Sequence, residues 1–378
     1  MSCHTIITPY NPRWKADYEA VREMISAELG ENLAAVYHIG STAVEGLSAS
    51  PVIDVMAVMP DETAKAAAAA RLSGVPASGA APALETCPGI TAADGFRLYI
   101  FSRSQGMAVR GRLAFRDYLR SHPDEAQAYG EFKAKLASAG GSEEQKKAYI
   151  EKLQQKAFAW RLDAMTREEQ TLEIIDGLKG EYPGAECTLD YNQAWKLLVS
   201  VRLAAQCTDA RVNEVVKDLY AKFPDVRSLA AAGVEDIERI VKPCGLGHSK
   251  ARDISACMKI LENQYGGNVP DDFDALLKLP GVGRKSANLI MGDVFGKPAI
   301  VTDTHCIRLV NRMGLVDGIK EPKKVEMALW KLVPPEEGSD FCHRLVYHGR
   351  EVCTARTAPH CDRCCVRDLC RRCGVEEK

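Results

Sequence analysis

The sequence of 378 residues contains no apolar run long enough to cross a bilayer, which argues against a membrane-spanning helix. Its N-terminus lacks the basic-then-apolar order of a signal peptide, so we expect a cytoplasmic location. The net charge is also small. The formal value of −2 gives no overall attraction to nucleic acid, so any DNA-binding surface must be local. Hydrophobic residues make up 46 %, which argues against a largely disordered chain.

The full length of the chain is sufficient for two domains. Strand signals are confined to its first part. The β-branched run 51–58 and the segment 96–101 predict strands. Residues 142–164 predict one long amphipathic helix. After that helix the pattern becomes a series of short helices separated by Gly and Pro. We therefore expect an α+β domain over 1–165 and an all-helical domain over 166–378.

Fourteen cysteines are present, and disulfides are not expected in a cytoplasmic chain of this size. Seven are scattered singly and are predicted to be buried free thiols: Cys3, Cys87, Cys187, Cys207, Cys244, Cys257 and Cys306. Four near the C-terminus have the order C-x7-C-x2-C-x5-C: Cys353, Cys361, Cys364 and Cys370. Their density predicts a thiolate site for zinc or an iron–sulfur cluster. The spacing disfavours a zinc ribbon, which needs a long loop between two C-x2-C pairs.

A Gly-rich turn, Leu279-Pro-Gly-Val-Gly-Arg-Lys285, lies between two predicted helices. Proline fixes one backbone angle, and the two glycines allow positive φ and a close backbone approach. A helix-hairpin-helix of this kind offers N–H groups and a helix N-terminus to a DNA phosphate, although such a turn is as often merely structural. The predicted DNA-contacting residues of the turn are Pro280, Gly281, Val282, Gly283 and Arg284.

A lysine and a carboxylate accompany this turn. Lys285 stands in the first turn of the second helix, and Asp303 follows in Val301-Thr-Asp-Thr-His305. An amine, a carboxylate and a phosphate-binding turn are the parts needed to attack a sugar carbon of DNA and form a Schiff base. The plainer alternatives are a solvated surface lysine and an aspartate that caps the following helix.

Five short segments resemble the endonuclease III branch of the helix-hairpin-helix DNA glycosylase superfamily: Ala205–Asp209, Gly245–Lys250, Leu279–Asn288, Asp303–His305 and His348–Arg350. The resemblance covers about residues 166–372. It implies a two-lobed helical fold that binds double-stranded DNA, carrying a damaged base or an abasic site, between its lobes. The implied activity is a bifunctional glycosylase and abasic-site lyase that removes oxidised pyrimidines and cuts 3′ of abasic sites by β-elimination. We expect a monomer.

The resemblance also implies residue roles. Lys285 is the nucleophile that attacks C1′ and expels the base, and Asp303 activates the amine and stabilises positive charge on the sugar. Gln206 enters the gap left by the flipped base, and Leu246 is the wedge beside it, although a core position is equally expected for a leucine. Adenine-specific relatives usually lack the lysine. The alternative is a non-catalytic DNA-binding or redox-sensing protein of the same fold.

The family pattern around its [4Fe–4S] cluster is C-x6-C-x2-C-x5-C, so the first interval is one residue longer here. We interpret the difference as an insertion that keeps Cys361 as the ligand, and the alternative is His360, which stands at the strict spacing. Cys365 and Cys373 are then not ligands. The cluster loop is expected over 353–370.

Residues 5–165 resemble a GrpB-type family with a nucleotidyltransferase-like fold. The resemblance rests on three segments: 37–47, 51–54 and 115–123. Gly40 and Ser41 are candidates to hold a phosphate, and Asp54 is a candidate to hold Mg²⁺. Nucleotidyl transfer by this fold normally needs a carboxylate pair, and Met56 stands where the second is expected. The alternative function is therefore nucleotidyl transfer or nucleotide binding here, with the helical domain directing it to DNA.

Overall fold

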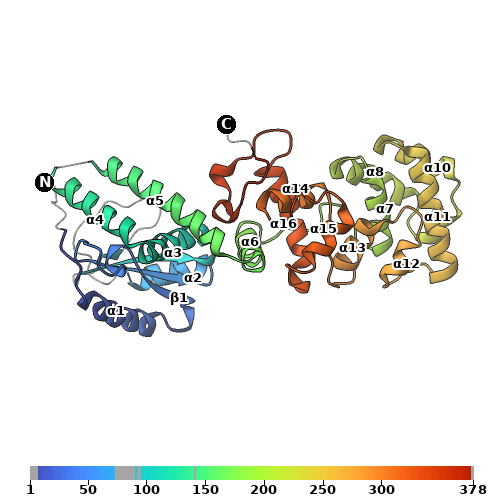
Figure 1. The fold of residues 1–378 in the computed structure, drawn as a ribbon. Coiled ribbons are helices and arrows are strands. Elements are labelled where there is room, and N and C mark those ends of the chain that lie inside the picture. Colours follow the sequence, from blue (N-terminus) through green and yellow to red (C-terminus); the bar gives the residue numbers. More distant parts are fainter. Residues whose placement is uncertain (1–6, 73–89, 92–94, 140–141, 376–378) are drawn as a thin grey trace. The chain divides into compact units, whose positions relative to one another are not determined.

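The computed structural model describes residues 7–72, 90–91, 95–139 and 142–375 (Figure 1). Cys3 and Cys87 lie outside the described residues. The chain forms two compact units: Met1–Glu181 with Cys365–Leu369, and Tyr182–Cys364 with Cys370–Lys378. The first division follows Glu181, whereas we expected one near residue 165. Helix α6 (Arg167–Glu181) belongs to the first unit because it packs there, for example through an ion pair between its Glu173 and Arg161.

The first unit contains a four-stranded sheet with the order β1-β2-β4-β3. Its strands are β1 (Ala35–Ile39), β2 (Ile53–Met59), β3 (Ile90–Thr91) and β4 (Phe96–Ser102). β2 pairs antiparallel with β1 and parallel with β4, so that Val55 lies opposite His38 on one side and Leu98 on the other. The predicted strands over 51–58 and 96–101 are confirmed as β2 and β4, and the α+β class of this part of the chain is confirmed with them.

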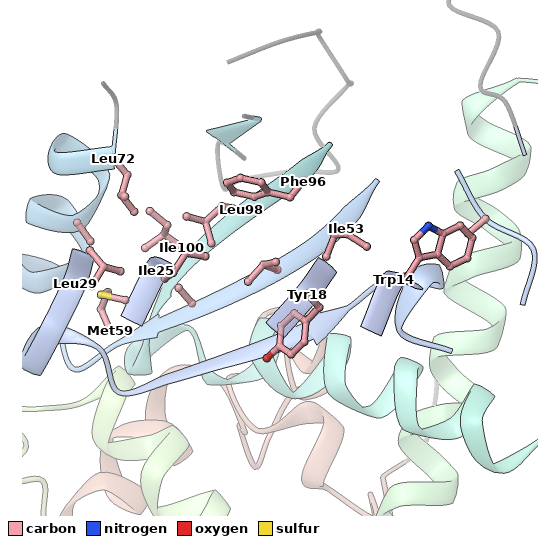
Figure 2. Packing of buried hydrophobic residues seen from close by; sticks show 14 residues of the cluster. Trp14, Tyr18, Ile25, Leu29, Ile53, Met59, Leu72, Phe96, Leu98 and Ile100 are labelled. Atoms are coloured by element: carbon pink, nitrogen blue, oxygen red, sulfur yellow. The ribbon is translucent and has the colours of Figure 1, made fainter. Parts of the chain in front are cut away.

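Alternation along β2 buries both faces of the sheet. Val55 packs on one face with residues of α1 (Arg13–Leu29) and α2 (Glu62–Leu72), in the cluster that Figure 2 shows around Ile25 and Leu98. Met56 lies on the other face with Phe101. Full burial of one such side chain contributes about 1.5–3 kcal/mol to the free energy of unfolding. Both faces of the central strand are thus committed to packing.

Three further helices form a second core in this unit: α3 (Gly106–Ser121), α4 (Pro123–Ser138) and α5 (Glu143–Ala164). Their buried residues include Leu119, Tyr129 and Ala157. Ser142 begins α5 with a capping box, because its Oγ accepts from the N–H of Gln145 (3.3 Å) and the Gln145 side chain accepts from the N–H of Ser142 (3.1 Å). The long helix predicted over 142–164 is confirmed.

Five residues from the far end of the chain complete the first unit. The carboxylate of Asp368 accepts two hydrogen bonds from the Arg110 guanidinium, at 2.7 and 2.9 Å, and both side chains are buried. The Gln170 side-chain amide donates to the carbonyl of Leu369 at 2.7 Å. A bidentate pair of this kind fixes both distance and orientation. Residues 365–369 are therefore held by side chains of α3 and α6.

The second unit is helical throughout, since residues 182–364 and 370–375 are all described and contain no strand. Its α-helices are α7 (Ala194–Leu203), α8 (Asp209–Lys222), α9 (Val226–Ala231), α10 (Val234–Val241), α11 (Gly247–Tyr265), α12 (Phe273–Leu277), α13 (Arg284–Asp293), α14 (Thr304–Met313), α15 (Pro322–Leu329) and α16 (Gly338–Glu351) (Figure 1). Leu309 of α14 and Phe341 of α16 are fully buried in it. The predicted all-helical character is confirmed. Among the residues described, no helix combines the length and the apolar composition needed to span a membrane.

Candidate active site

The Gly-rich turn joins α12 to α13 as the sequence predicts. Gly281 has a φ of 77°, and a Cβ there would lie 2.7 Å from Cδ of Arg202, so both the backbone angle and the space require glycine. Gly283 differs from our expectation. It caps α13 with an ordinary φ of −101°, and nothing lies within 4 Å of a Cβ built on it. The turn is exposed at both glycines.

Arg284, which we predicted to contact DNA, is engaged within the unit. Its guanidinium donates to both carboxylate oxygens of Glu326, at 2.6 and 3.0 Å, and lies over the ring of Phe273. Glu326 is buried on α15, so the pair joins α13 to α15. The observed contacts of Arg284 fix the start of α13.

Lys285 is exposed in the first turn of α13, and Asp303 caps α14. One carboxylate oxygen of Asp303 accepts from the backbone N–H of Cys306 at 2.7 Å, which is the capping role that we weighed against a catalytic one. The other oxygen remains available for a second role. This hydrogen bond at the N-terminus of α14 fixes the orientation of the Asp303 carboxylate.

Charged groups of two other helices, α8 and α16, interact electrostatically with this region. Arg350 of α16 donates to Oδ2 of Asp209 at 2.5 Å, and Thr188 donates to the same oxygen at 2.6 Å. Burial works to raise the pKa of Asp209, but these hydrogen bonds outweigh it and hold the pKa below its usual value. The positive charges of Arg350 and Lys285 act in the same direction. Asp209 is therefore an anion within electrostatic reach of Lys285.

His305 completes this group. Burial lowers the pKa of His305, Asp303 opposes the shift, and the charges of Arg350 and Lys285 add to it. Its ring lies against α16, where a Cβ on Gly349 would come within 2.5 Å of Nδ1. The contact requires glycine at that position. Sequence reasoning assigned no role to Asp209 or Arg350, although both lie in segments that carry the family resemblance.

Gly349→Ala is expected to destabilise the protein by about 1–3 kcal/mol, because the methyl group forces the His305 ring out of its position. Thermal unfolding measures the change. Gly184→Ala is the matched control, since nothing lies within 4 Å of a Cβ at Gly184. Equal melting temperatures for the two variants would contradict the packing described.

Gln206 and Leu246 share an unusual backbone. Both have left-handed φ values, 59° and 51°, which cost a non-glycine residue about 1–2 kcal/mol each. Both side chains are exposed, and Leu246 has 56 % of its surface accessible, so it does not occupy the core position that we considered as an alternative. Strain of this kind collects at functional sites. It aims two side chains into solvent at the ends of α7 and η4 (Lys242–Cys244).

The four clustered cysteines are free thiols. Burial raises the pKa of Cys370 to about 11, and the neighbouring thiols of Cys353 and Cys361 act in the same direction, so these three lie near one another. Cys364 contacts Nε2 of His348 at 3.4 Å. In the part of the chain that the structure describes, no three His, Cys, Asp or Glu side chains are placed to bind one metal ion. A [4Fe–4S] cluster makes a different demand, one thiolate for each iron.

The N-terminal candidates come together at the start of β2. A Cβ on Gly40, whose φ is 73°, would overlap the Asp54 carboxylate. Asp54 accepts from the Arg97 guanidinium at 3.0 Å, and Ser41 accepts from Nζ of Lys133 at 2.8 Å. Burial lowers the pKa of Lys133, which sequence reasoning missed, to about 7. Asp54 and Ser41 are thus already paired with cations of the same unit, and their phosphate and Mg²⁺ roles stay predictions.

Comparisons with known proteins match a different family to each of the two units. Residues 4–159 match the GrpB protein family, and residues 199–335 match the HhH-GPD superfamily base excision DNA repair protein. The fold and site of the second unit are therefore those of a helix-hairpin-helix base excision DNA repair protein.

Endonuclease III of Synechocystis sp. is 42 % identical over 207 residues, which are 54 % of this chain and 93 % of that protein. Endonuclease III of Escherichia coli K12 is 40 % identical over 199 residues, 53 % of this chain and 93 % of that protein. The solved structure of a non-covalent endonuclease III–DNA complex matches with a TM-score of 0.53 and 39 % identity, and covers 55 % of this chain and 97 % of that one. The chain belongs to the endonuclease III family, and its helical part is a DNA glycosylase and abasic-site lyase of base excision repair.

Proposed function

We propose that the second unit removes oxidised pyrimidines from double-stranded DNA and cuts the resulting abasic site through a Schiff base on Lys285. The observation that carries the proposal is the position of Lys285, exposed at the start of α13 directly after the Gly281 turn. A related endonuclease III, 39 % identical, has been trapped as a covalent intermediate with DNA. A nucleophilic side chain on that scaffold accounts for such an intermediate.

The chemistry divides between Lys285 and Asp303. The neutral amine of Lys285 attacks C1′, the bond to the base breaks, and the base leaves with the bonding electrons. Asp303 takes part through its carboxylate, which stabilises positive charge on the sugar and accepts the proton that the amine loses. The C1′–O4′ bond then breaks with its electrons going to O4′, O4′ takes the proton back from Asp303, and the lone pair of Nζ forms a protonated imine with C1′. Loss of a C2′ proton expels the 3′ phosphate, and water hydrolyses the imine.

DNA binding is proposed for the exposed turns. The N–H groups of residues 280–284 and the start of α13 suit a backbone phosphate. Gln206 and Leu246 suit the gap and the neighbouring stack when the reacting nucleotide turns out of the duplex, because both are exposed on left-handed turns. We propose further that a monomer acts in the cytoplasm, a location that unpaired cysteines favour.

We propose a [4Fe–4S] cluster bound by Cys353, Cys361, Cys364 and Cys370. All four are free thiols within one short loop, a donor set that suits the cluster. The proposal prefers Cys361 to His360, which is exposed, and leaves Cys365 out of the set. When bound, the cluster supplies no step of the cleavage reaction and fixes the loop.

Purified protein is expected to be brown, to absorb broadly in the visible range and to contain iron in place of zinc. Cys370→Ser is expected to lose most of that absorption, because it removes one thiolate from the set, whereas Cys373→Ser, an exposed cysteine of the same region, is expected to keep it. Elemental analysis and absorption spectra measure both. Zinc without visible absorption would contradict the assignment.

Borohydride trapping tests the function. The full chain is incubated with a duplex that carries one abasic site, and borohydride reduces any imine to a stable amine. A covalent protein–DNA band is the expected result. The absence of a band from protein loaded with its cluster would overturn the lyase assignment and favour a binding or sensing role.

A further inference from the structure

One lysine of the second unit is completely buried and does not belong to the reaction described above. Lys250 lies on α11 with 0 % of its surface exposed. Its Nζ donates to two backbone carbonyls, those of Leu203 and Cys244, each at 2.8 Å. Burial lowers the pKa of Lys250, as expected for an ammonium group withdrawn from water.

The two carbonyls are the last of their elements. Leu203 ends α7, three residues before Gln206, and Cys244 ends η4, two residues before Leu246. The backbone N–H of Lys250 also donates to the carbonyl of Leu246 at 3.0 Å. The Lys250 side chain therefore holds the backbone where two turns begin. These are the turns of Gln206 and Leu246, which have left-handed backbone angles and exposed side chains.

A second contact ties the same helices to the Gly-rich turn. Arg202, adjacent to Leu203, donates to Asp253 and Ser249 of α11 at 2.9 and 3.3 Å. The Arg202 side chain also fills the space that a side chain on Gly281 would need. The three turns proposed to face DNA are thus all connected to α11, and Lys250 is the buried residue at the centre of these contacts.

A hydrophobic side chain of similar volume would fill the site without the cost of burying a charge. The ammonium group adds two directed hydrogen bonds, which fix the separation of the two carbonyls. We propose that Lys250 is a positioning residue for the insertion of Gln206 and Leu246 into the duplex. It ties the Gln206 turn to the Leu246 turn, so that these two side chains enter the DNA as one rigid unit. The inference rests on the proposed function, because it presumes that these side chains enter DNA.

A mutant cycle tests the proposal. Single-turnover cleavage of an abasic duplex is measured for wild type, Lys250→Met, the pair Gln206→Ala with Leu246→Ala, and the triple variant. Methionine fills the space of lysine without N–H donors. Lys250→Met is expected to slow cleavage about tenfold. The triple variant is expected to be no slower than the pair, because Lys250 acts only through the two turns.

The proposal would be overturned if the triple variant cleaved more slowly than the pair by the same factor by which Lys250→Met is slower than wild type. Such a result would mean that Lys250 acts independently of the Gln206 and Leu246 side chains, as a merely structural lysine does. A second readout follows insertion itself: 2-aminopurine opposite a non-cleavable abasic analogue is expected to brighten less with Lys250→Met than with wild type. An unchanged signal would also overturn the proposal. Lys259→Met, an exposed lysine on the same helix, is the matched control.

Thermal unfolding is recorded for each variant first. If Lys250→Met shows no cooperative transition, Lys250→Arg takes its place in the same cycle, because arginine retains charge and N–H donors but places them differently. Failure of the proposed function is separate from all of these outcomes. It is a wild-type protein that gives no borohydride adduct, whereas the cycle compares variants of a protein that does.

Discussion

Lys285→Ala is expected to give no borohydride adduct and to cut abasic duplex more slowly by a factor on the order of 10⁴ or more. The amine supplies the electron pair for the new bond to C1′, and alanine offers none. Binding should persist, because the Gly281 turn and the Arg284–Glu326 pair, which shape this part of the unit, are untouched. Single-turnover cleavage and titration with a duplex carrying a non-cleavable abasic analogue measure the two effects.

Lys259→Ala controls for the loss of one positive charge, since Lys259 is an exposed lysine elsewhere in the same unit. It should cleave and trap like the wild type. Cleavage at the wild-type rate by Lys285→Ala would remove Lys285 from the mechanism while leaving the family assignment intact.

Asp303→Asn is expected to slow cleavage by about 10²-fold or more while leaving the melting temperature unchanged. Asparagine is as good an N-cap as aspartate, so the hydrogen bond from the Cys306 N–H to the start of α14 is kept. Only the negative charge near the sugar is lost. Single-turnover kinetics and thermal unfolding, measured on the same preparation, separate the two contributions.

Asp303→Ala provides the comparison, because it removes the cap as well as the charge. It should lose activity to a similar extent and also about 1 kcal/mol of stability. If Asp303→Asn cleaved like the wild type and Asp303→Ala were only less stable, the carboxylate would be a cap and nothing more.

Local patterns predicted much of this molecule. The β-branched run of β2, the long helix α5 and the Gly281 turn depend on neighbours in the chain, and each is where the sequence indicates. Lys285 could be chosen because it follows such a turn. Gly283 was assigned a freedom that its turn does not use, since one left-handed residue suffices there.

Contacts between distant segments could not be predicted in this way. Asp209 and Arg350 are far apart in the sequence, and no spacing rule pairs them, yet they form one ion pair beside the candidate nucleophile. Lys250 was visible only as part of a family segment. Its burial depends on where α7 and η4 end around it, which the pattern of α11 alone does not reveal.

The pair between Arg110 and Asp368 has a consequence for synthesis. A ribosome makes the first unit's sheet and helices early, and domains generally fold as they emerge. Asp368, however, is translated 258 residues after Arg110, so Arg110 gains its bidentate partner only after the helical unit has been made. The first unit is therefore completed only after most of the second unit has been translated. A chain that stops short of Asp368 leaves the Arg110 guanidinium without that partner.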